Sequence, residues 1–159
     1  MATSSVTAAQ AYKAALVDAM TTLVAGQEVL VTFGHPGREV ANWHDVVSFA
    51  DTTSAQQVAT MGTNRSREET LTQKVWVSCE RAGDQDQDQE RVASDAAYGL
   101  LGLLEHHVRV TDTTLGGVVR QCFLTSHTAT GETDPKFLDY GRLIEIEAEF
   151  TALVRVTGP

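Results

Sequence analysis

Three glutamates near the end of the chain, Glu145, Glu147 and Glu149, are the candidates for acid–base chemistry. In an extended strand their two-residue spacing puts the three carboxylates on one face, about 7 Å apart. General acid–base catalysis needs neighbouring carboxyl groups whose environments push their pKa values apart, and an open strand face supplies no such difference. The pattern therefore favours a carboxylate-lined surface over an active site.

A second acidic group follows part of the template of a calcium-binding loop. Asp84, Asp86 and Asp88 occupy its first, third and fifth positions. Asp95 falls at the twelfth position, where a bidentate carboxylate is needed. The sixth position is Gln89 where the sharp turn requires glycine, and the preceding segment is typical of a strand where the motif has a helix. We expect a solvated acidic loop that caps the following helix, with calcium binding as the alternative.

The histidines and the glycine-rich segments match no known catalytic or metal-binding pattern. His106 and His107 are adjacent, so on a helix they point about 100° apart and cannot chelate one ion as an i, i+4 pair can. His35 and His44 fall in one loop and His127 in another. The Gly-x-Ser-x-Gly turn and the glycine-rich phosphate loops are absent. We therefore expect no catalytic residue, no metal and no cofactor.

Length and charge indicate one globular domain over residues 1–159, because a chain of this size with 42% hydrophobic residues can bury one full core. Its net charge of −9 opposes adsorption to nucleic acid or to an anionic membrane. Neither a signal peptide nor a membrane-spanning run is evident, so we expect synthesis in the cytoplasm. Cys79 and Cys122 fall in strand-like patterns and are expected to be buried free thiols.

The first half of the chain is typical of a helix followed by short strands. Apolar residues at spacings of three and four predict an amphipathic helix over residues 7–25. Alternation predicts a strand over residues 28–33. Two extended runs, residues 45–50 and 55–61, flank the sequence Asp-Thr-Thr-Ser and predict a hairpin.

A longer strand and a second helix follow. Residues 69–80 alternate as a central strand, with Leu71, Val75, Val77 and Cys79 expected on its core face. Residues 92–108 predict a helix, in which Gly99 and Gly102 are expected to let its backbone approach a neighbour closely. Its expected core face consists of Val92, Ala96, Leu100, Leu103, Leu104 and His107.

Two strands complete the expected fold, one over residues 118–126 and the other starting at Arg142 and ending at Val156. In the last strand every second residue from Ile144 to Val156 is expected on the core face, and the opposite face is expected to be largely acidic. The fold class that follows is α+β, with a single, mainly antiparallel sheet packed against two helices. Long polar loops are expected at residues 34–44, 62–67 and 126–139, and we expect them to become ordered on assembly.

The order of these elements resembles the tail terminator proteins of long-tailed, siphovirus-type bacteriophages. The matching features are the first helix, the Gly- and Pro-rich loop after the first strand, Val75-Trp76-Val77, the acidic start of the second helix and the alternating last strand. The most specific feature is the segment from Asp112 to Arg120, Asp-Thr-Thr-Leu-Gly-Gly-Val-Val-Arg, with Thr113 where many relatives have proline. The resemblance covers roughly residues 8–156.

This resemblance implies a structural virion protein, made in the host cytoplasm, and no enzyme. Proteins of this family form a hexameric ring on the head-proximal end of the tail tube, end tube growth and join the tail to the head. The implied partners are further copies of the chain, the tail tube protein, a head-completion or connector protein and the tape measure protein. Neither sequence-specific nucleic-acid binding nor a membrane is implied. The alternatives are another neck or minor tail protein and, in a different class, a small acidic calcium-binding or enzymatic domain.

In that setting the three glutamates acquire a structural interpretation. We hypothesise that Glu145, Glu147 and Glu149 face the lumen of the ring, where like charge keeps passing DNA from sticking. The alternative is a strand face that meets solvent or a neighbouring subunit.

Overall fold

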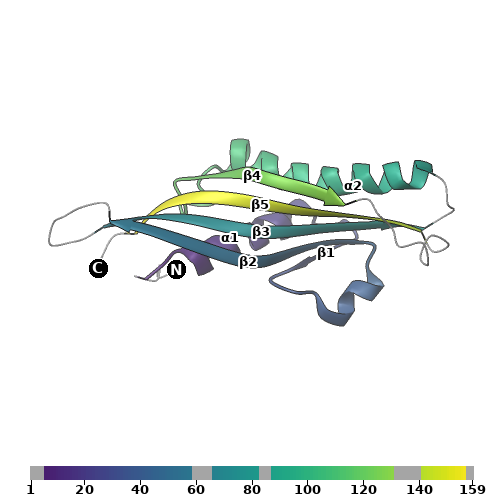
Figure 1. Ribbon diagram of the computed structural model, residues 1–159, viewed down its shortest axis with the longest axis horizontal. Coiled ribbons are helices and arrows are strands. Elements are labelled where there is room, and N and C mark those ends of the chain that lie inside the picture. Colours follow the sequence, from purple (N-terminus) through teal and green to yellow (C-terminus); the bar gives the residue numbers. More distant parts are fainter. Residues whose placement is uncertain (1–5, 59–65, 83–86, 131–140, 157–159) are drawn as a thin grey trace.

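The computed structural model describes residues 6–58, 66–82, 87–130 and 141–156, and its five strands form one sheet in the order β1-β2-β3-β5-β4 (Figure 1). The pairing of β1 with β2 is parallel and the other pairings are antiparallel. The predicted α+β class, with a mainly antiparallel sheet and two main helices, is therefore confirmed. The elements are α1 (Ala9–Leu23), β1 (Val29–Thr32), the 3-10 helix η1 (Gly37–Asn42), β2 (Asp45–Val58), β3 (Arg67–Arg81), α2 (Gln87–His106), the π-helical segment η2 (His107–Thr111), β4 (Gln121–Thr130) and β5 (Arg142–Val156).

Both α-helices cover the same face of the sheet. The buried residues Tyr12, Leu16 and Met20 of α1 belong to one cluster with buried residues of α2 and with alternate residues of β3 and β5. Figure 1 shows α2 running along the sheet, where it packs against β3 and β5. Among the described residues, no helix is long and apolar enough to cross a membrane. The opposite face, called here the open face, is covered by neither α-helix.

The central strand and the last strand have the predicted core faces. Leu71, Val75, Val77 and Cys79 are at most 1% exposed. On β5, every second residue from Ile144 to Val156 is buried. Because side chains alternate across a strand, the intervening residues of both strands lie on the open face.

The predicted hairpin over residues 45–50 and 55–61 is wrong, because one continuous strand, β2, runs from Asp45 to Val58. β2 pairs with β3 on both sides of a register shift between Phe49 and Thr52. Phe49 lies opposite Val75 and Thr52 lies opposite Gln73, so β2 contains one extra residue at this point. A β-bulge therefore accommodates the turn-type sequence without reversing the chain.

The predicted second helix exists, and Leu100 and Leu104 are buried as predicted, but the rest of its buried face differs from the predicted one. Val92 is 47% exposed and Leu103 is 36% exposed. Gly99 and Gly102 have open space where a Cβ would lie, so they do not mark a close backbone contact. The buried positions are Ala93, Ala97, Leu100, Leu101 and Leu104 of α2, with Val108 of η2. In the first half of α2 the small residues Ala93 and Ala97 face the sheet. The larger residues Val92 and Leu103, which the sequence placed on the core face, lie on the exposed side of the helix.

The segment between η2 and β4 is a turn. The Asp112 carboxylate accepts hydrogen bonds from the Gly116 amide at 2.9 and 3.1 Å, and the backbone has positive φ at Leu115 and at the two glycines that follow it. β4 starts at Gln121, three residues later than predicted, and includes residues 126–130, which were predicted as a loop. The rest of that loop and residues 62–65 lie outside the described residues.

Candidate functional site

The three candidate glutamates project from β5 onto the open face. Glu145 lies opposite Ser78 of β3, Glu147 opposite Trp76 and Glu149 opposite Lys74. This is the position that the alternation of β5 predicts. The three side chains therefore share a surface that the helices leave uncovered, whereas their position relative to a lumen stays a prediction.

Neighbouring side chains give the three carboxylates different surroundings. The Lys74 ammonium lies 3.1 Å from a carboxylate oxygen of Glu147, and this contact raises the pKa of Lys74. Glu149 accepts a hydrogen bond of 3.3 Å from the hydroxyl of Ser126 on β4. In the described part of the chain, the side chain of Glu145 has no hydrogen bond or ion pair. These contacts are those of an exposed polar surface rather than of a buried acid–base pair.

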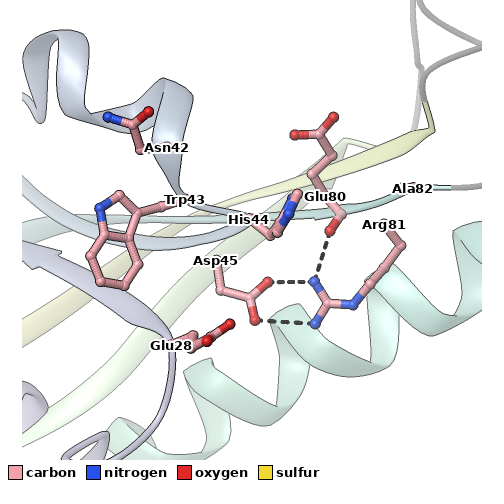
Figure 2. A pocket seen from close by; sticks show the side chains of 8 residues that line it. All are labelled: Glu28, Asn42, Trp43, His44, Asp45, Glu80, Arg81 and Ala82. Carbon is pink, nitrogen blue, oxygen red and sulfur yellow. Dashed lines mark hydrogen bonds and ion pairs between the residues drawn. The ribbon is translucent and has the colours of Figure 1, made fainter.

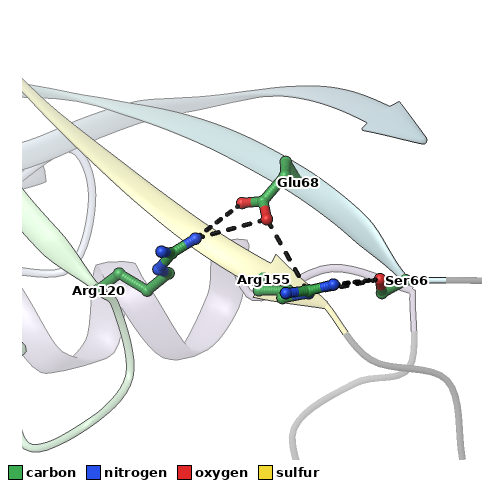
Figure 3. A network of polar contacts seen from close by, with 4 residues as sticks. All are labelled: Ser66, Glu68, Arg120 and Arg155. Atoms are coloured by element: carbon green, nitrogen blue, oxygen red, sulfur yellow. Dashed lines mark hydrogen bonds and ion pairs between the residues drawn. The ribbon is translucent and has the colours of Figure 1, made fainter. Parts of the chain in front are cut away.

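A basic group lies at the other end of the open face, where Arg120, Arg155, Glu68 and Ser66 form a polar network (Figure 3). The Glu68 carboxylate lies 3.3 Å from the Arg120 guanidinium and 3.9 Å from that of Arg155. Arg155 also donates a hydrogen bond of 3.1 Å to the Ser66 hydroxyl. The open face is therefore acidic along the middle of β5 and carries an excess of cations near the end of that strand.

The segment around η1 covers one corner of the open face and leaves a groove of about 610 Å³. Val46 of β2 points to this side of the sheet yet is only 3% exposed. The groove is lined by side chains from η1 and its preceding turn, from β2 and from β3, with Lys13 and Glu145 also contributing.

A second cavity, of about 570 Å³, lies where β1 and β2 begin and β3 ends (Figure 2). The Arg81 guanidinium contacts both carboxylate oxygens of Asp45, at 2.6 and 3.1 Å, and donates to the Glu80 carbonyl at 2.8 Å. The carboxylate of Asp45 raises the pKa of Arg81. The ion pair joins the start of β2 to the end of β3. Because Asp45 already neutralises Arg81, this guanidinium is not free to bind an anionic ligand.

The two cysteines are buried free thiols, as predicted. Burial raises the pKa of Cys79 to about 12, with a further contribution from the charge of Asp45. Burial likewise raises the pKa of Cys122 to about 11. The Tyr12 hydroxyl donates to the Phe150 carbonyl at 2.9 Å and lies 3.4 Å from the Cys122 sulfur. A thiol with a raised pKa is protonated near neutral pH, so these groups belong to the core.

The histidines lie apart in the fold. His35 precedes η1 and accepts a hydrogen bond from the Gly37 amide, while His127 packs edge-on against Tyr98 with ring centroids 5.6 Å apart. Within residues 6–58, 66–82, 87–130 and 141–156, no group of three His, Cys, Asp or Glu residues is placed to hold a metal ion. Asp84 and Asp86 of the calcium-loop pattern lie outside the described residues.

The groove is the feature that the sequence did not reveal. Strand alternation already places Lys74 and Trp76 on the face opposite the core. The approach of η1 to that face is a tertiary contact between segments that share no local pattern. The only local signal is the Gly-His-Pro-Gly break after β1, which marks a turn without giving its direction.

No family model and no curated protein matches the chain. Among solved structures, the chain is similar to a protein chain described as "Virion of native gene transfer agent (GTA) particle". The two are 14% identical, with a TM-score of 0.40, and the match covers 90% of this chain and 93% of the other. A TM-score below 0.5 does not indicate a function.

Proposed function

We propose that this chain is a structural protein of a phage-type virion, which forms a ring on the head-proximal end of the tail tube. There it ends tube growth and joins the tail to the head. The observation that carries this proposal is the two-sided sheet, with helices on one face and an uncovered, charged face on the other. A sheet packed against two helices is the fold implied by the resemblance to tail terminator proteins.

The distribution of charge and exposure supports an assembly role. Trp76, Phe123 and Leu153 are each between 38% and 45% exposed on the open face, beside the glutamates of β5. Large exposed apolar side chains with polar neighbours are typical of surfaces that meet other proteins. The polar groups of the described residues that could do chemistry are either exposed or already paired. A binding surface therefore explains the residues better than an active site does.

Electron microscopy of the purified chain, alone and with its tail tube protein, tests the proposal. We expect rings of six subunits, and tubes that carry one ring at a single end and stop growing. Rings that bind a head connector but leave tubes uncapped would assign the chain to the neck instead. A monomer whose melting temperature rises with calcium would contradict both roles and favour the calcium-binding alternative.

A further inference from the structure

The groove beneath η1 combines an exposed aromatic surface with a rim of charged groups. Trp76 on the sheet is 38% exposed and Val40 of η1 is 41% exposed, and both line the groove together with Pro36. A planar indole and two aliphatic side chains form an apolar slot at the surface. Such a slot stabilises a side chain that is flat and partly apolar.

The charges at the two ends of the groove differ in what they contact. Lys13 donates a hydrogen bond of 3.0 Å to the Ala50 carbonyl, and its ammonium lies 4.5 Å from the centroid of the Phe33 ring. Asp51 lines the same end, so the charges there are of opposite sign. Within the described part of the chain, the side chains of Glu145 and Asp51 line the groove without a hydrogen bond or ion pair. Both carboxylates are therefore free to bind a cation, and Glu145 is the one that lies beside Trp76 on the sheet.

Trp76 and Glu145 are diagonal neighbours on adjacent strands, because Trp76 pairs with Glu147 and Ser78 pairs with Glu145. Diagonal neighbours on one sheet face lie about 7–8 Å apart, within reach of a long side chain that lies between them. A guanidinium that stacks on the Trp76 indole can thus direct its N–H groups to the Glu145 carboxylate. We propose that this groove binds an arginine side chain from an extended segment of a partner protein.

Charge and shape select this occupant. An indole face and a carboxylate together favour guanidinium, which is planar and less strongly hydrated, over the compact ammonium of lysine. The net charge of −9 disfavours a nucleic acid, and it weakens attraction to a second copy of the same acidic chain. The inference goes beyond the proposed ring, because it concerns a partner and depends on the groove alone.

Binding of a tetra-arginine peptide with blocked termini tests the proposal. The full chain carrying Trp43→Phe retains Trp76 as its single tryptophan, so its emission reports on the groove. We expect the peptide to change this emission saturably and to bind more tightly than tetra-lysine. Glu145→Gln should weaken binding about fivefold, because it removes the partner charge but not the stacking surface.

Glu149→Gln is the matched control, since Glu149 lies on the same strand face but does not line the groove. Its affinity for tetra-arginine should equal that of the parent protein. Equal weakening by the two variants would show general attraction to an acidic surface and overturn the proposal. The proposal would also be overturned if the chain bound no tetra-arginine but self-associated, and if Glu145→Gln abolished this self-association. The occupant of the groove would then be a second copy of the chain. Thermal melts of each variant confirm that the fold is intact. Rings that cap tubes yet bind no tetra-arginine would refute this inference alone.

Discussion

Glu69 shows how one buried side chain joins the start of a helix to the sheet. It is fully buried on β3, and its carboxylate accepts hydrogen bonds from the Thr7 hydroxyl at 2.5 Å and from the Ala8 amide at 2.8 Å. The Ser54 hydroxyl and the Gln56 amide of β2 also donate to it, at 2.6 and 2.8 Å. All four partners donate to the carboxylate, and the Ala8 N–H and the Gln56 NH2 group cannot accept, so each carboxylate oxygen faces at least one group that requires an acceptor. The negative charge also lies where the dipole of α1 favours it.

Replacement of Glu69 by glutamine should therefore destabilise the fold. One carboxylate oxygen becomes an amide that donates, which leaves a buried donor facing a donor and costs about 1–3 kcal/mol of unfolding free energy. Urea denaturation measures this difference. Glu68→Gln on the same strand is the control, because its partners Arg120 and Arg155 are exposed and its expected cost is about 0.5 kcal/mol or less. Equal costs would show that the buried network contributes nothing beyond an exposed pair.

The same residue makes stability depend on pH. Burial acts to raise the pKa of Glu69, but the hydrogen bonds from Ser54, Thr7, Ala8 and Gln56 outweigh it and lower the pKa below its ordinary value of 4.5. A lowered pKa in the folded state means that the contribution is present above the unfolded pKa and is lost as pH falls through the folded pKa. We expect the melting temperature to fall more steeply below pH 4.5 in the parent chain than in Glu69→Gln. Parallel curves would contradict this assignment.

At the level of elements, Gly141 fixes the place where β5 begins. Its φ is +143°, and a Cβ added to it would lie 2.3 Å from the Arg81 carbonyl oxygen at the end of β3. Gly141→Ala should cost at least about 2 kcal/mol, because it adds both backbone strain and a clash with main-chain atoms. Gly26→Ala is a matched control, with a φ of +82° but open space around the added atom. Its expected cost is about 1 kcal/mol. Chemical denaturation of both variants separates the two effects, and equal losses would mean that the contact with β3 does not constrain β5.

The elements also show what local sequence determines. The alternation of β3 and β5 predicted their buried faces correctly. In a strand with one helix-covered face, every second side chain is buried, and the sequence shows this period directly. The continuous strand β2 was missed, because the Asp-Thr-Thr-Ser sequence is typical of a turn. In the structure its last three residues pair regularly with β3, and the bulge lies just before them, at Ala50 and Asp51. α2 carries two apolar stripes, and the packing of Ala93 and Ala97 against the sheet selects the one that is buried. The groove under η1 likewise depends on contacts between distant segments.

At the scale of the whole molecule, the sheet separates a helix-covered core from an uncovered, charged face. Glu145, Glu147 and Glu149 lie on the open face with Lys74 as their nearest cation, and the helices cover the other face. In a ring whose open faces point inward, these carboxylates would repeat around the channel and repel the phosphates of DNA. An outward orientation would instead present them to solvent or to other proteins. Charge reversal distinguishes the two orientations.

Changing the three glutamates to lysine should slow or trap the genome during passage through assembled particles. Lysine places cations along the channel, and each cation that contacts a phosphate strengthens DNA binding in a salt-dependent manner. Asp18, Glu90 and Asp95 on the helices provide the matched control, because changing either set of three to lysine moves the net charge from −9 to −3.

Infectivity and the rate of DNA release from intact particles are the measurements, with rings counted by microscopy to exclude an assembly defect. We expect loss of DNA release only for the variant with lysines at 145, 147 and 149, and relief of that loss at high salt. Normal release from intact particles would show that these glutamates do not line the channel, and equal loss in both variants would attribute the effect to net charge.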